Sequence, residues 1–264
     1  MSQILDIEVK VPARLDYIPL NHYQKYMKVV ENIDTESEES SDFLNLKALE
    51  IFCGLELKES YKLPMTAFGA VLQQLSDCLS EETPLVKRFS IKGTDGAIIE
   101  FGFHPNLKRL TFGEYVDLDS YLSDWSNAHK AMAVLYRPII GEKKDMYRIE
   151  DYESSEKYSD VLQYMPTSIA LGAMVFFLSF RNEVSQTFSG LFSSTDGGGG
   201  FIKSREAVFG EKWGWYQSLY ALAGGDVTKF DEIARESLYK CLTWLMFENE
   251  KVELENKRIK DAYK

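Results

Sequence analysis

The spacing of apolar and polar residues is strand-like at the start of the chain and helix-like over the next seventy or so positions. Segment 4–11 is close to a two-residue alternation and predicts a strand, which Pro12 ends. A short helix is predicted at 22–30. Longer helices are predicted at 43–52 and 66–79, because each segment collects its apolar residues on one face.

A hairpin pattern comes next, followed by a helix start. Segments 85–91 and 97–103 are predicted strands, and the turn sequence Gly-Thr-Asp-Gly separates them. Thr111 and Glu114 then stand three positions apart. This is the spacing of a capping box, in which each side chain accepts a hydrogen bond from a backbone amide of the other residue.

Helical periodicity continues from the capping box to Leu135. Pro138 is expected to end this helix, with Arg137 as a favourable cation in its last turn. Segment 141–158 is charged and rich in tyrosine, which predicts a long irregular segment on the surface. A further helix is predicted at 168–184.

Two polar segments divide the chain. Residues 34–42, DTESEESSD, predict an acidic surface loop. Residues 193–200, SSTDGGGG, predict a flexible joint, because consecutive glycines lose much conformational entropy in a regular element. We therefore expect an α+β body at 1–192 and a helical C-terminal unit with a charged tail at 201–264. The expected fold class is α+β and predominantly helical, with a small antiparallel hairpin or sheet in the N-terminal half.

Composition limits the choice of partners. The 264 residues include 41 acidic and 30 basic ones, a formal net charge of −11. Lysine and arginine neutralise phosphates in nucleic-acid complexes, so this charge argues against nucleic acid as a partner. The most apolar run, 169–180, is shorter than the roughly twenty residues that span a bilayer, so no membrane association is expected. Cys53, Cys78 and Cys241 lie far apart in apolar contexts, which indicates buried thiols in a reducing cytosol.

No catalytic, cofactor-binding or metal-binding residue is expected. Each histidine lacks a second histidine or cysteine at ligand spacing. Three aspartates near the predicted helix start suit a metal site, but the helix dipole favours carboxylates there without any chemistry. The run GGGGFIKS at 197–204 lacks the glycine before lysine that a phosphate-binding loop needs. The histidines are His22, His104 and His129, and the aspartates are Asp117, Asp119 and Asp124.

Four aromatic residues follow the predicted joint and are candidate partner-binding residues: Trp213, Trp215, Tyr216 and Tyr220. Part of their spacing fits one helix face, which suits packing in a core. The alternative is an exposed anchor for a partner, because Trp and Tyr dominate the hot spots of protein interfaces.

The last predicted helix, 229–262, repeats an apolar residue every seven positions: Leu238, Leu245, Val252 and Ile259. The companion heptad positions include Glu248 and Glu255, so the pattern is too thin for an autonomous coiled coil. The end of this helix is expected to be solvated or bound to a partner, with Leu245, Val252 and Ile259 as candidate contacts. Deleting 248–264 is expected to leave folding intact and to weaken partner binding.

Residues 98–140 carry three short motifs, which read FGF-x-PNL at 101–107, TFGEY-x-DLD at 111–119 and HKAMA-x-LYRP at 129–138. Together they resemble a family of tailed-bacteriophage proteins. Two further places are similar to the two ends of phage tail-assembly chaperones. They read IPL-x-x-YQ-x-Y at 18–26 with EIF-x-G at 50–54, and ALAGGD at 221–226 with L-x-x-L at 242–245.

The resemblance implies a non-enzymatic phage protein that acts in tail or baseplate assembly. Its partners would be other phage structural proteins, with self-association as an open alternative, and it would work in the host cytoplasm during infection. A virion component, such as a cargo, connector or tail-lumen protein, is a second interpretation. An enzyme of unrecognised type is a third.

Overall fold

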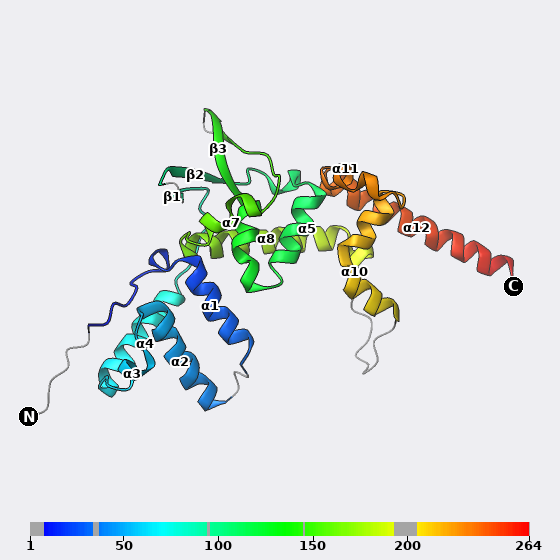
Figure 1. The fold of residues 1–264 in the computed structure, drawn as a ribbon. Coiled ribbons are helices and arrows are strands. Elements are labelled where there is room, and N and C mark those ends of the chain that lie inside the picture. The colour runs from blue at the N-terminus through cyan, green and yellow to red at the C-terminus, as the bar shows by residue number, and fades with distance from the viewer. Residues whose placement is uncertain (1–7, 34–36, 94–95, 145, 193–204, 264) are drawn as a thin grey trace, which may run out of the picture. The chain divides into compact units, whose positions relative to one another are not determined.

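The computed structural model describes residues 8–33, 37–93, 96–144, 146–192 and 205–263 (Figure 1). Helices predominate, and a small antiparallel sheet lies in the N-terminal half, which confirms the predicted fold class. The chain divides into two compact units. Unit 1 comprises Met1–Pro105 and Tyr121–Phe176, and unit 2 comprises Asn106–Ser120 and Phe177–Lys264.

Unit 1 begins with short helices packed around leucines. Leu49, Leu55 and Leu75 form the centre of this cluster. Gly54, at φ 67°, ends α2 in the left-handed conformation that glycine adopts without strain. The elements are η1 (Leu15–Tyr17), α1 (Leu20–Glu31), α2 (Glu38–Cys53), α3 (Leu57–Ser60) and α4 (Met65–Leu79).

Two expectations for this region need correction. Residues 38–42 of the expected acidic loop are the first turn of α2, because Ser37 caps that helix by accepting a hydrogen bond from the Ser40 amide at 3.2 Å. Residues 34–36 lie outside the described part. Residues 8–11 of the expected strand have no strand pairing, and residues 4–7 are not described.

The sheet has four antiparallel strands in the order β1 (Arg88–Lys92), β2 (Ile98–Phe103), β3 (Tyr136–Lys143) and β4 (Met146–Ile149). The predicted hairpin is β1–β2, with Phe89 opposite Phe101. The Tyr147 ring covers Gly102, where an added Cβ would lie 2.5 Å from the ring. The Tyr147 hydroxyl donates to the Phe103 carbonyl at 2.7 Å, so β4 is tied to β2 across β3.

Strands β3 and β4 replace the predicted helix stop and the predicted irregular segment on the surface. Arg137 is not in a last helical turn but in β3, where it is buried, pairs with Gly102 and lies 5.8 Å from the Tyr152 ring. Pro138 lies inside β3, and its carbonyl accepts a hydrogen bond from the Glu150 amide at 2.9 Å. Long-range pairing with β2 therefore overrides the local signal.

The single helix predicted up to Leu135 is broken into three pieces. Asp124 causes the break, because its side chain accepts from the Ser126 amide at 2.7 Å and starts a new turn. The pieces are α5 (Phe112–Tyr121), η3 (Trp125–Asn127) and α6 (Ala128–Leu135), followed after the sheet by α7 (Glu156–Leu162) and α8 (Thr167–Thr187).

Unit 2 is built around the start of α5. The predicted capping box is confirmed: the Thr111 amide donates to Glu114 at 2.8 Å, and the Glu114 amide donates to Thr111 Oγ1 at 3.2 Å. A short bridge joins this cap to the start of α12, because the Leu238 amide donates to the Leu110 carbonyl at 3.0 Å. The other elements are η2 (Leu107–Arg109), α9 (Ser189–Phe192), α10 (Arg205–Leu222), η5 (Val227–Lys229), α11 (Phe230–Ala234) and α12 (Leu238–Ala262).

The division of the chain therefore differs from a simple N- and C-terminal split. Unit 2 combines the C-terminal helices with Asn106–Ser120 and with the second half of α8 from Phe177. We expected the body to reach residue 192 and the second unit to start at 201. The expected glycine joint, 193–200, lies outside the described residues.

Candidate interaction surface

The candidate aromatic residues of unit 2 lie on both sides of a kink in α10. Gly214 has φ 39° and ψ −124°, which are not helical values. Trp213 precedes the kink and Trp215 follows it. Residues with a Cβ rarely adopt this positive φ, so glycine suits the kink. The kink lets the indoles of Trp213 and Trp215 face different surroundings.

Trp215 is directed into unit 2. Its ring meets Phe112 edge-on at 5.7 Å and Tyr115 at 5.6 Å between ring centroids. Its indole Nε1–H donates to Asp119 Oδ2 at 2.9 Å, and Oδ1 of Asp119 lies 2.7 Å from Nε of Arg181. Trp215 therefore holds α10 against α5 and α8.

The other three candidate residues, Trp213, Tyr216 and Tyr220, are exposed. Trp213 and Tyr216 have ring centroids 5.6 Å apart, and Tyr216 meets Phe230 of α11 edge-on at 5.4 Å. Tyr220 covers Gly225, whose added Cβ would lie 3.0 Å from the Tyr220 hydroxyl. About half of Tyr216 and Tyr220 remains accessible, at 49% and 55%. We call Trp213, Tyr216, Tyr220 and Phe230 the aromatic surface.

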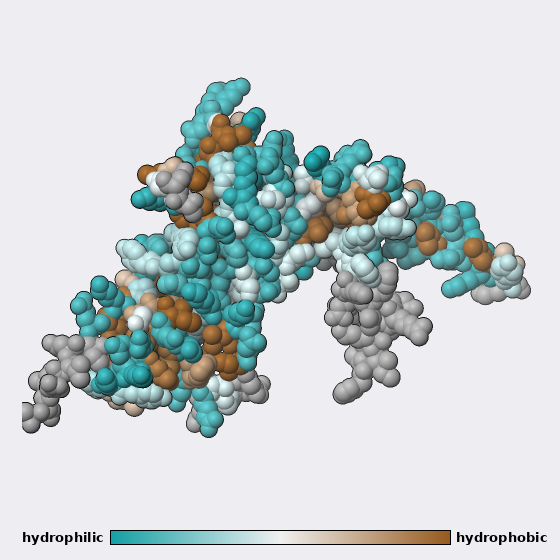
Figure 2. All heavy atoms as spheres, in the orientation of Figure 1, coloured by the Kyte–Doolittle hydropathy of each residue, from teal (hydrophilic) through white to brown (hydrophobic). Residues whose placement is uncertain are grey.

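Helix α12 changes from packed to fully exposed along its length. Leu238, Cys241 and Leu242 are buried, and Leu245 is half-buried. Every residue from 250 to 262 is exposed, including Val252 and Ile259. Figure 1 shows this part of α12 running on beyond α10 and α11, and Figure 2 shows isolated hydrophobic spots on its otherwise hydrophilic surface.

Some exposed apolar residues of unit 2 were not singled out from the sequence. Trp244 and Phe247 lie on α12, both exposed, on a different side from Val252. Phe230 joins the aromatic surface from α11. The seven-residue spacing predicts contacts on one side of α12 only. The apolar run Trp244–Phe247 is the sequence feature that indicates the second exposed side.

The aspartates proposed as dipole partners have more specific positions. Asp119 is in the last turn of α5, not near its start, and it binds Arg181 and Trp215. Asp124 caps η3, and the amide of Ser126 holds the pKa of its carboxyl below the usual range. Both positions have structural partners.

The histidines and cysteines of the described chain show no convergent chemistry. His129 Nδ1 lies 3.0 Å from the Gln24 amide nitrogen, and burial lowers its pKa. Burial also raises the pKa of the Cys53 and Cys241 thiols to about 11. Within the residues that the structure describes, no three His, Cys, Asp or Glu side chains are grouped so as to hold a metal ion.

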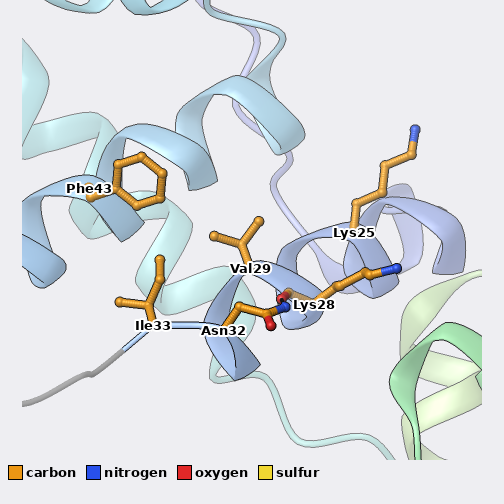
Figure 3. A pocket seen from close by; sticks show the side chains of 6 residues that line it. All are labelled: Lys25, Lys28, Val29, Asn32, Ile33 and Phe43. Carbon is orange, nitrogen blue, oxygen red and sulfur yellow. Dashed lines mark hydrogen bonds between the residues drawn. The ribbon is translucent and has the colours of Figure 1, made fainter.

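Unit 1 has a shallow hollow of about 400 Å³ between α1 and α2. Figure 3 shows Val29, Ile33 and Phe43 along it, with the ammonium groups of Lys25 and Lys28 pointing away from Phe43. No carboxylate and no histidine is among the described residues that line the hollow, so its lining pairs neither lysine with a general base.

In the described ranges, no helix is long and apolar enough to cross a bilayer. No family model, no curated protein and no solved structure matches this chain.

Proposed function

We propose that this chain is a non-enzymatic phage morphogenesis protein, which binds other phage structural proteins during tail or baseplate assembly in the host cytoplasm. The observation that carries the proposal is the aromatic surface of unit 2. Its exposed Trp and Tyr rings are of the kind that anchor protein interfaces. The resemblance of segments 101–107, 111–119 and 129–138 to tailed-phage proteins supplies the phage context.

The burial of the candidate residues assigns them different roles in this proposal. Trp213, Tyr216 and Tyr220 would contact the partner, because a large part of each is accessible. Trp215 would position α10, since its indole already binds Asp119. Leu245, Val252 and Ile259 would contact a partner along one side of α12.

The test of partner binding is co-purification from infected cells. The tagged full chain is compared with a variant in which Trp213, Tyr216 and Tyr220 are changed to alanine. The matched control changes Tyr17, Tyr61 and Tyr164 to alanine, three tyrosines of unit 1 that are at least as exposed. We expect the first variant to lose captured phage structural proteins and the control to keep them. Equal capture by both variants would contradict the proposal.

Mass spectrometry of purified particles distinguishes an assembly factor from a component of the finished virion. Absence of the chain from particles indicates an assembly factor, whereas stoichiometric presence indicates a virion component such as a connector or tail-lumen protein. If no phage structural protein is captured and the chain is also absent from particles, both the assembly-factor and the virion-component interpretations are rejected.

A further inference from the structure

We propose that the outer part of α12, residues 248–263, pairs antiparallel with the same segment of a second copy of this chain. This inference deepens the proposed function: it rests on the proposal that exposed faces of unit 2 bind protein, and it names the partner of α12.

The length of exposed helix calls for a covering partner. Residues 250–262 are all exposed, and they make up about half of a 25-residue helix. A helical segment as short as this exposed part is marginal in water on its own, because helical stability comes mostly from packing of an apolar face. Val252 and Ile259 lie on one side, in line with the buried Leu238 and half-buried Leu245. The packed side of α12 thus continues, uncovered, to the end of the helix.

The charges on this segment have a polarity that fits a second copy. Residues 248–255 contain four glutamates and one lysine, a net charge of 1 − 4 = −3. Residues 256–263 contain Lys257, Arg258 and Lys260 against Asp261, a net charge of 3 − 1 = +2. An antiparallel copy places each acidic half beside a basic half, whereas a parallel copy would place like charges together.

The helix dipole alone does not account for this polarity. Its effect falls off within the first and last turns of a helix. Lys260 is the basic residue in the last turn of α12, so Lys257 and Arg258 lie before the region that the dipole favours. The glutamates at 248–255 lie in the middle of the helix, far from its positive end.

One register satisfies both the apolar and the charged positions. With the two-fold axis between residues 256 and 257, Val252 of each chain lies beside Ile259 of the other, offset by about two residues or roughly 3 Å. On one flank of this stripe Glu253 meets Lys260, and on the other flank Glu255 meets Arg258. The symmetry makes each contact twice, as in an isologous dimer.

The pairing is expected to be reversible and sensitive to salt. Each chain contributes only Val252 and Ile259 to the paired apolar stripe, and exposed ion pairs are weakened by salt. Such a dimer would carry two linked copies of the aromatic surface. A multivalent partner would therefore be bound more tightly by the dimer than by one chain.

The experiment is sedimentation equilibrium of the full chain with charge-exchange variants. Variant one carries Glu253→Lys and Glu255→Lys, and variant two carries Arg258→Glu and Lys260→Glu. We expect the native chain to reach twice its 30.3 kDa mass at high concentration and low salt. Each variant alone should have a dimer dissociation constant raised at least tenfold. Their equimolar mixture should dimerise at least as tightly as the native chain, because all four contacts are then complementary.

The matched control carries Glu250→Lys and Lys257→Glu on the opposite side of the helix and should dimerise like the native chain. Orientation is tested by mixing Lys251→Cys with Ala262→Cys under mild oxidation, which should link two different chains. Circular dichroism checks that every variant keeps its helix content.

A native chain that is monomeric throughout, a mixture that fails to dimerise, or variants that dimerise like the native chain would each overturn the inference. Capture of phage structural proteins by a monomeric chain would overturn this inference alone. A dimer that captures none of them would overturn the proposed function alone.

Discussion

The indole Nε1–H of Trp215 donates a hydrogen bond to Oδ2 of Asp119 at 2.9 Å. The other carboxylate oxygen of Asp119 lies 2.7 Å from Nε of Arg181. One carboxylate thus joins three helices of unit 2, namely α10, α5 and α8. The exposed rings of Trp213 and Tyr216, on either side of Trp215 in the sequence, contact each other with their centroids 5.6 Å apart.

Changing Asp119 to alanine is expected to lower the free energy of unfolding by about 1.5–3 kcal/mol, because the charge-assisted hydrogen bond from the Trp215 indole is lost. The ion pair with Arg181 is lost as well, but it adds little because the Arg181 side chain is half exposed. Trp215→Phe keeps the aromatic packing and should cost about 1 kcal/mol. The double variant should cost less than the sum of the two, since both remove the same contact.

Urea unfolding followed by circular dichroism measures these changes. The control is Asp261→Ala in the exposed end of α12, which should stay within about 0.5 kcal/mol of the native chain. Additive costs for the two single changes would show that Asp119 and Trp215 do not act together.

Two helical glycines are expected to respond to alanine in opposite directions. Gly172 in α8 is buried, and an added Cβ would lie 2.4 Å from the carbonyl oxygen of Pro84, which is backbone and cannot move away cheaply. Gly172→Ala should therefore destabilise unit 1 by about 1–3 kcal/mol or more. Gly69 in α4 is exposed with open space around it, so Gly69→Ala should stabilise by up to about 1 kcal/mol.

Denaturation midpoints of the two glycine variants, measured side by side, check this pair. A neutral Gly172→Ala would mean that α8 and the Pro84 segment do not approach each other as closely as described.

The capping box at the start of α5 also anchors the start of α12. Thr111→Ala removes the oxygen that accepts from the Glu114 amide at 3.2 Å, and it should cost about 1 kcal/mol. Thr111→Ser keeps the hydroxyl and should cost much less. Hydrogen exchange gives a local readout: the amides of Phe112 and Leu238, which bond across the bridge, should exchange faster in the alanine variant only.

Local patterns predicted the elements whose signals are carried by neighbouring residues. Helix 66–79 was found as α4 (Met65–Leu79), because its apolar face and the preceding proline lie within the segment itself. The capping box formed both of its bonds for the same reason. Strands β3 and β4 were missed because Pro138 is a strong local stop signal, whereas pairing with Phe101 comes from a segment almost forty residues away.

The candidate surface was predictable only in part. The spacing of Trp213, Tyr216 and Tyr220 indicated a shared face, and all three are exposed. The inward direction of Trp215 depends on the backbone at Gly214, which no helical periodicity encodes. The partners of Asp119 come from α8 and α10, so a reading of its own helix could not supply them.

Cys53, which is partly buried, and Cys241, which is buried, predict a loss of stability at alkaline pH. Burial raises the pKa of Cys53 and Cys241 from 9.0 to about 11 in the folded chain, so the folded state holds these protons more tightly than the unfolded state. Stability from this source is therefore complete below pH 9 and falls as pH rises from about 9 to about 11. The Tyr115 hydroxyl, whose pKa burial raises from 10.0 to about 12, adds to the loss as pH rises from about 10 to about 12.

The same shift predicts slow thiol chemistry in the folded protein. A pKa two units above the ordinary value lowers the thiolate fraction about 100-fold at pH 8, and the thiolate is the reactive form. Reaction with a disulfide reagent should be slow in buffer and fast in denaturant. The double variant Cys53→Ala and Cys241→Ala should lose less stability between pH 9 and pH 11 than the native chain. Rapid native labelling of both thiols at pH 8 would contradict the raised pKa values.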